Sequence, residues 1–145
     1  MNRSTVATER WVLFATVLAS GMAFIDATAL NVALPAIQTR FHATGTQLIW
    51  IVNAYAVMVA ALLLLGGALG DRCGRRRVFM IGIALFAVAS LACGLAPGTG
   101  SLIAARAFQG LGAALMIPGS LSLISDTFEP SRRGQAIGTW TACSV

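Results

Sequence analysis

The sequence contains little charge for its length. Only 10% of its 145 residues are charged, with five acidic residues and no lysine, so all ten basic residues are arginine. A soluble domain carries about 25% charged residues. Here 57% of the residues are hydrophobic, and the mean hydropathy is +0.81. These values exclude an ordinary soluble domain and indicate an all-α membrane protein, a polytopic helical bundle.

Histidine and cysteine are also scarce. The single His42 has no neighbouring ligand residue, and Cys73, Cys93 and Cys143 are widely spaced. This pattern predicts neither a metal site nor a disulfide framework. The sequence has no nucleophile–base set and no phosphate-binding loop, so we expect neither an enzyme nor a cofactor. The net charge of +5 does not indicate a nucleic-acid partner, because the arginines lie mostly at the ends of apolar runs.

Four apolar runs are each long enough to cross a bilayer as a helix, which takes about 20 residues. They cover approximately residues 12–34, 48–70, 78–96 and 101–125. A fifth run begins near residue 136 and is too short to cross within this sequence. We therefore expect one domain, 1–145, with four transmembrane helices and the start of a fifth. A secretory signal over residues 1–25 is a weaker alternative, because the apolar run continues beyond it.

The connections between the runs carry turn and capping signals. Pro35 is expected to close the first helix, because proline lacks an N–H group and its ring clashes with the preceding turn. The segment 36–47 then becomes a polar external loop that contains His42. Thr44 or Thr46 is a candidate N-cap for the second helix. Residues 97–100, Pro-Gly-Thr-Gly, predict a tight external turn.

The distribution of arginine predicts the orientation. Eight arginines fall on one side of the membrane: Arg3, Arg10, Arg72, Arg75, Arg76, Arg77, Arg132 and Arg133. Arg40 alone falls on the other side, and Arg106 lies within an apolar run. Because short loops rich in arginine stay in the cytoplasm, we expect a multi-pass protein of the cell membrane with a cytoplasmic N-terminus.

The most informative segment is the turn between the second and third runs, residues 67–77. Asp71 is expected at the C-terminal end of a helix, where the macrodipole disfavours an anion, so nearby arginines or another helix N-terminus must compensate it. Seven residues of the turn form a pattern: Gly67, Leu69, Asp71, Arg72, Gly74, Arg75 and Arg76. This pattern resembles the signature loop between the second and third helices of the major facilitator superfamily.

The resemblance implies that the chain is the N-terminal portion of a transporter, with the lipid bilayer and a C-terminal half as partners. It also implies that the loop locks the cytoplasmic side closed by contacting that other half. The simpler alternative is that the basic turn only orients the helices.

Asp26 lies about 15 residues into the first helix, roughly 22 Å from its cytoplasmic end. An ionised, unpaired carboxylate within the bilayer costs several kcal/mol, so Asp26 must find a partner, face a cavity or take up a proton. Because burial favours the protonated form of a carboxyl group, the residue is a candidate for proton exchange. The alternative is an ion pair that only joins two helices.

The residues around Asp26 extend the resemblance. The pattern Asp26-x-Thr28-x-x-Asn31-x-Ala33-Leu34-Pro35 resembles the first-helix motif of the drug:proton antiporter branch that has fourteen spanning helices. Thr28 and Asn31 are three residues apart and share a helix face, which suits either a polar cavity lining or an interhelical contact.

The fourth run carries a second polar stripe. At i, i+3 and i+4 spacing it presents Arg106, Gln109, Gly110, Ala113 and Ile117 on one face. The segment 106–114 is similar to the fourth-helix motif of the same superfamily, where the arginine is implicated in proton coupling. We therefore expect Asp26 and Arg106 to face a central cavity with Gln109. The alternative is that Arg106 extends to the nearby external surface.

Small residues and one proline predict how the helices pack. Gly66 and Gly70 form a Gly-x-x-x-Gly pair, and Gly110 and Gly112 lie on the fourth helix, so each pair permits close helix contact. Pro118 should bend the fourth helix, which its neighbours can tolerate.

Together these features predict proton-coupled efflux of small hydrophobic or cationic compounds by alternating access. The energy source would be the proton gradient. Three alternatives remain open at this point: an uptake or metabolite permease of the same superfamily, a compact four-span efflux protein, and a membrane subunit without transport activity. The strong arginine bias and the specific basic turn argue against the four-span efflux protein.

Overall fold

The computed structural model describes the backbone of residues 3–144 and the side chains of residues 8–142. In this range the chain forms α-helices and no strand. The helices are α1 (Arg3–Phe41), α2 (Gly45–Cys73), α3 (Arg75–Gly94), α4 (Thr99–Thr127) and α5 (Pro130–Ser144). The first four are long and apolar enough to cross a membrane, which confirms the predicted polytopic helical bundle.

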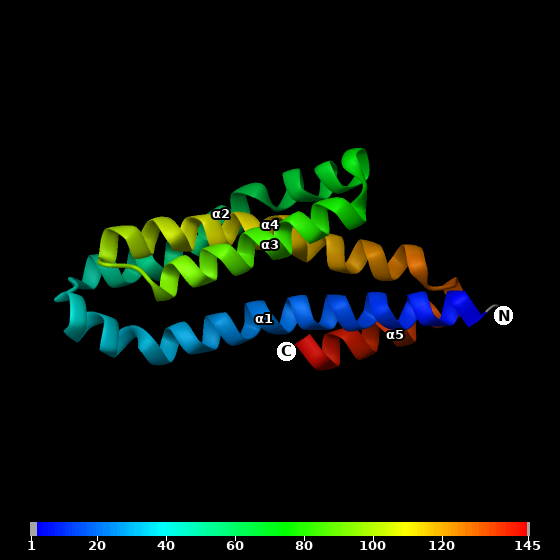
Figure 1. Ribbon diagram of the computed structural model, residues 1–145, viewed down its shortest axis with the longest axis horizontal. Helices are drawn as coiled ribbons and strands as arrows, with labels where there is room; N and C mark the ends of the chain where they lie inside the picture. The colour runs from blue at the N-terminus through cyan, green and yellow to red at the C-terminus, as the bar shows by residue number, and fades with distance from the viewer. Residues whose placement is uncertain (1–2, 145) are drawn as a thin grey trace.

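The long helices run side by side along the longest axis of the molecule (Figure 1). The start of α1, the α2–α3 turn and the α4–α5 connection lie at one end, which we call the arginine end because it holds residues 71–77. The α1–α2 and α3–α4 connections lie at the other end. The short α5 runs back along the N-terminal half of α1 (Figure 1).

The central element of the packing is α4. Both α2 and α3 pack along most of its length, whereas α1 contacts it less and touches α2 only slightly. Small residues allow this close approach. A Cβ atom on Gly110 would lie 2.6 Å from the Tyr55 carbonyl oxygen of α2, and one on Gly112 would lie 2.6 Å from the Phe86 nitrogen of α3. A Cβ atom on Gly66 would collide with the Ala114 carbonyl group of α4.

Of the predicted Gly66–Gly70 pair, only Gly66 makes a close helix–helix contact. Gly66 meets the α4 backbone, but the nearest atoms to a Cβ on Gly70 belong to Arg75, at 3.8 Å, which is ordinary contact. Toward the α2–α3 turn, α2 rises away from α4 (Figure 1), so only the first glycine of the pair lies against the α4 backbone.

The prediction that Pro35 ends the first helix is wrong. Helix α1 continues through Pro35 to Phe41, so the predicted loop 36–47 shrinks to the three residues between Phe41 and Gly45. Proline removes one helical hydrogen bond, but packing can offset that loss. Ile37, beyond the proline, packs against the buried cluster of Ile51, Ala96 and Leu102.

The short α1–α2 connection is closed by local interactions. His42 adopts a positive φ of 49°, which reverses the chain direction. Thr44 is the N-cap of α2, as one of the two predicted alternatives requires: its hydroxyl oxygen accepts from the Gln47 N–H group, and its own N–H donates to Gln47 Oε1 at 2.9 Å. This reciprocal pair is a capping box.

Candidate functional site

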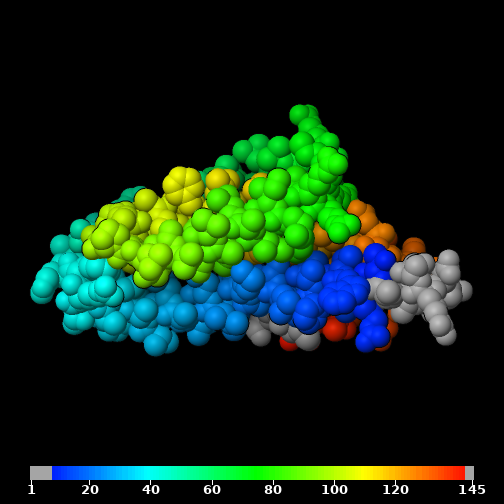
Figure 2. Space-filling view, viewed as in Figure 1, coloured from blue at the N-terminus to red at the C-terminus, as the bar shows by residue number. Residues whose placement is uncertain are grey.

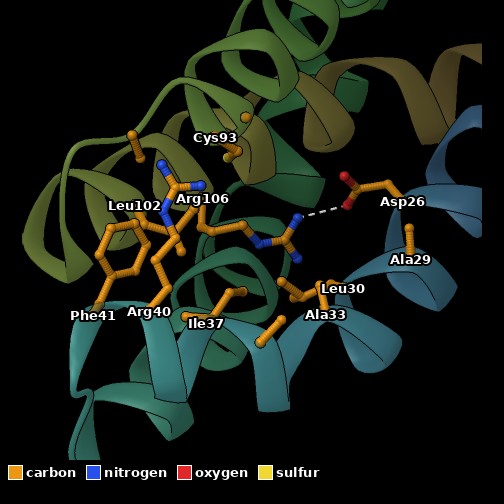
Figure 3. A pocket seen from close by; sticks show the side chains of 13 residues that line it. Asp26, Ala29, Leu30, Ala33, Ile37, Arg40, Phe41, Cys93, Leu102 and Arg106 are labelled. Carbon is orange, nitrogen blue, oxygen red and sulfur yellow. Dashed lines mark hydrogen bonds and ion pairs between the residues drawn. The ribbon is translucent and has the colours of Figure 1, made fainter.

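The main polar cluster joins α1 to α4 through an ion pair inside the bundle (Figure 3). Arg106 Nη1 lies 2.6 Å from Asp26 Oδ2. Gln109 completes a triangle with the pair: its amide nitrogen donates to Asp26 Oδ1 at 2.6 Å, and its amide oxygen accepts from Arg106 Nη1 at 2.7 Å. The residues are 80 and 83 positions apart in the chain, so the fold brings these predicted site residues together.

Arg106 is held on several sides. Its Nε atom donates to the Ile51 carbonyl oxygen at 3.3 Å, and its guanidinium carbon lies 4.6 Å from the Tyr55 ring centroid. The residue is only 3% exposed. The alternative in which Arg106 reaches the external surface is therefore wrong, because the ion pair and α2 hold the side chain inside.

The stripe on α4 behaves as predicted over most of its length. Gln109, Gly110 and Ala113 are buried with Arg106, and Ile117 lies at its exposed edge. A buried amide needs partners for both ends, and here Gln109 has them. Cys93 of α3 also donates its thiol to Gln109 Oε1 at 3.5 Å, so α3 joins the cluster.

A cavity of about 350 Å³ lies beside the ion pair, between α1, α3 and α4. Figure 3 shows the Arg106 side chain extending from α4 across this space toward Asp26 on α1. The apolar side chains Leu30, Ile37 and Leu102 line it, and Arg40 lies toward its outer part. The ion pair is thus accessible from one side while its α4 half is enclosed, and the Asp26 side chain is 16% exposed.

Thr28 and Asn31 lie apart from this cluster. Both are exposed, and neither lines the cavity beside the ion pair. The Thr28 hydroxyl donates to the Phe24 carbonyl oxygen of its own helix at 3.0 Å. Their place in a substrate cavity stays a prediction.

A second charged cluster lies at the arginine end. Arg75 pairs with Asp71 at 2.9 Å through Nη2 and with Asp126 at 2.6 Å through Nη1. This arginine provides the compensation that was predicted for Asp71 at the end of α2. Gly74 makes the α2–α3 turn with a φ of 97°, a conformation that favours glycine. The cluster therefore ties the turn to the end of α4.

The rest of the predicted gating loop is less constrained. Arg72 and Arg76 are exposed, and neither has an ion pair within the described part of the chain. Gly67 faces Pro118 of α4 at ordinary contact distance, 3.9 Å from its would-be Cβ. Helix α4 continues through Pro118 to Thr127.

Sequence analysis missed Asp126 and Tyr55 as members of these clusters, and it also missed a further ion pair. Asp126 could have been found, because the chain has only five acidic residues for its ten arginines. A further pair joins Glu9, only 5% exposed, to Arg132 at 2.9 Å. Tyr55, which lies against Arg106, gave no signal because it lies in a mostly apolar segment and aromatic residues are common in such segments.

Comparison with known proteins places these clusters in a family context. The family model described as Major Facilitator Superfamily matches residues 16–145. The methylenomycin A resistance protein of Streptomyces coelicolor is 48% identical over 130 residues, which is 88% of this chain and 27% of that protein. The multidrug resistance protein Stp of Mycobacterium tuberculosis is 44% identical over 143 residues, 98% of this chain and 26% of that protein.

A third relative is the tetracenomycin C resistance and export protein of Streptomyces glaucescens. It is 40% identical over 129 residues, 89% of this chain and 24% of that protein. The chain therefore spans about a quarter of the length of the curated relatives it matches.

Proposed function

We propose, from the premise that this chain belongs to the Major Facilitator Superfamily, that it forms part of a proton-coupled efflux transporter. Its substrates would be small hydrophobic or cationic compounds, exchanged for protons by alternating access without a cofactor. The names of the relatives, which include antibiotic resistance and export, support this direction of transport over uptake.

The observation that carries the proposal is the ion pair between Asp26 and Arg106. Two charges inside membrane-spanning helices are costly and commonly mark a transport pathway. A proton that binds a carboxylate oxygen of Asp26 neutralises it and removes the ionic attraction between α1 and α4. Arg106 keeps Gln109, the Ile51 carbonyl oxygen and the Tyr55 ring as partners, so its charge stays on α4.

This arrangement gives proton binding a mechanical consequence. In the ionised state Asp26 is held by both Arg106 and Gln109, whereas in the protonated state only neutral hydrogen bonds remain. The cavity beside the pair offers a path by which a proton or a substrate reaches Asp26. Release of α1 from α4 is then the step that couples protonation to substrate exchange.

The cluster of Arg75, Asp71 and Asp126 suits a gating role at the arginine end. It joins the α2–α3 turn to α4, so a partner half that competes for Arg75 or for either carboxylate shifts the position of the turn. We propose that this end is cytoplasmic, in the cell membrane, because most arginines of the chain lie there. The second half of the transporter would supply the competing group.

The test uses the complete transporter that contains this sequence, in membrane vesicles with an imposed proton gradient. Efflux of the fluorescent cation ethidium is measured for wild type, Arg106→Ala and Arg10→Ala. Arg10 is the control arginine, because it is exposed on α1, does not line the cavity beside the ion pair and has no ion pair in the described chain. Arg106→Ala should abolish gradient-driven efflux, and Arg10→Ala should retain it.

Unchanged efflux in Arg106→Ala would refute proton coupling through this pair. Accumulation of the compound in the direction opposite to efflux would instead favour an uptake permease. The 145-residue chain alone, reconstituted in liposomes, is expected not to transport, because alternating access requires two bundles that move about a central site.

A further inference from the structure

The α2–α3 turn carries more positive charge than the ion pairs of the described residues neutralise. Within the described residues, four acidic side chains form ion pairs: Glu9 with Arg132, Asp26 with Arg106, and both Asp71 and Asp126 with Arg75. Arg76 and Arg77 are exposed in the next two positions after Arg75, and the described chain offers neither of them an ion pair.

These two arginines also lie at an unfavourable place in their helix. The first turn of α3 contains no acidic residue, and its N-cap, Gly74, provides no side-chain cap. A helix N-terminus carries a partial positive charge and is stabilised by anions. Arg76 and Arg77 add positive charge to that terminus. A bound anion would therefore compensate both the arginine charges and the partial positive charge of the helix N-terminus.

Two hollows adjoin these arginines. One, of about 580 Å³, lies between α1, α3 and α4 and has Trp11, Val12, Phe79 and Leu123 among its walls. The other, of about 510 Å³, follows α3 and is lined by Arg76, Arg77, Met80 and Ile81. Arg76 and Met80 line both hollows, so the two spaces adjoin along α3. Figure 2 shows the start of α3 above the N-terminal part of α1.

The walls combine a basic rim with an apolar floor. Trp11, 70% exposed, lies on α1 at the same end as the arginines, and an indole ring with this exposure is typical of a membrane interface. From Arg76 the hollow continues along α3 past Met80 toward the middle of the span. Each volume falls within the range of about 300–1,000 Å³ that is usual for small-ligand sites.

We propose that this surface binds an anionic phospholipid, with the phosphate on Arg76 and Arg77 and an acyl chain along Met80 and Ile81. Guanidinium groups bind phosphate through paired, charge-assisted hydrogen bonds. A phospholipid has an anionic phosphate that can pair with the arginines and an acyl chain that can cover the apolar floor. The surrounding bilayer supplies it at high concentration. The proposal does not depend on which substrate is transported.

The test uses the purified 145-residue chain in a mild detergent, with native mass spectrometry to measure bound lipid. Phosphatidylglycerol is compared with phosphatidylcholine, which has the same phosphate but no net charge. A basic residue near an anionic surface contributes about 1 kcal/mol. The double variant R76Q/R77Q should therefore weaken phosphatidylglycerol binding about 30-fold, equivalent to about 2 kcal/mol.

The matched control is R72Q. Arg72 is exposed in the same turn, but it lines neither hollow and lies at the C-terminal end of α2, where its charge is favourable. R72Q should retain wild-type binding, and the charge-preserving R76K/R77K should retain most of it. Far-UV circular dichroism checks that every variant keeps wild-type helicity, and R76K/R77K serves as the reference if R76Q/R77Q loses it.

Three results would overturn the proposal. One is equal binding of phosphatidylcholine and phosphatidylglycerol by the wild type. Another is a loss in R72Q as large as that in R76Q/R77Q, which would mean a diffuse charge effect. The third is displacement of the lipid by millimolar inorganic phosphate, which would mean a headgroup site without a contribution from the acyl chain.

Discussion

Removal of either partner of the buried ion pair should destabilise the bundle to different degrees. In Arg106→Leu, Asp26 keeps a single neutral donor, the Gln109 amide nitrogen. Breaking a buried pair in this way costs about 3–5 kcal/mol, because a charge is left without compensation. In Asp26→Asn, Arg106 still has Gln109, the Ile51 carbonyl oxygen and the Tyr55 ring. The expected cost is then about 1–3 kcal/mol, the value of one charged hydrogen bond.

The double variant provides the decisive measurement. If the two side chains interact directly, Asp26→Asn combined with Arg106→Leu should cost about 1–3 kcal/mol less than the sum of the two single changes. The assay is unfolding of the purified chain in mixed micelles, with increasing denaturing detergent followed by far-UV circular dichroism. If the losses of unfolding free energy add up in the double variant, the direct interaction is refuted. If Asp26→Asn costs more than Arg106→Leu, the idea that the other partners of Arg106 still stabilise it is refuted.

Three further predictions address the packing, the gate and the orientation. Gly66→Ala should destabilise the bundle by about 1–3 kcal/mol through overpacking against α4. Gly67→Ala, whose Cβ would make only ordinary contact with Pro118, should be neutral or slightly stabilising. The same unfolding assay measures both, and equal costs would contradict the helix contact. Arg75→Gln should change the transport rate of the complete transporter with little effect on unfolding, because its ion pairs are exposed, and Arg72→Gln should change neither. A reporter tag in the α2–α3 turn should report the cytoplasmic side and one in the α3–α4 turn the external side. The reverse result would refute the orientation, and the same side for both would refute the crossing of α3.

Much of the architecture could be predicted from the sequence because the bilayer imposes it. Apolar runs of about 20 residues correctly predicted four helices that are long and apolar enough to span a membrane, and Thr44 was one of the two predicted N-cap residues of α2. The main failure was at Pro35, where a local rule about proline predicted a helix end. Packing of Ile37 on a buried cluster beyond the proline overrides that rule, and such packing depends on residues far away in the chain.

The charged residues of the site were predictable individually, but not all of their contacts were. A carboxylate or an arginine within an apolar run is easily recognised as a candidate site residue, because a single charge inside the bilayer costs free energy. The partners Tyr55 and Cys93 belong to ordinary apolar segments and become part of the cluster only through the approach of α2 and α3 to α4. Asp126 joined Arg75 for the same reason, because 51 residues separate the pair in the chain.

The central position of α4 affects how the chain is made. During synthesis α2 and α3 leave the ribosome before α4, yet each of them rests mainly on α4 and only weakly on the other. The α2–α3 hairpin therefore enters the bilayer before its main packing partner, and its glycine-lined surfaces face lipid until α4 arrives. The same delay applies to Asp26, which spends that interval in the membrane without its guanidinium partner.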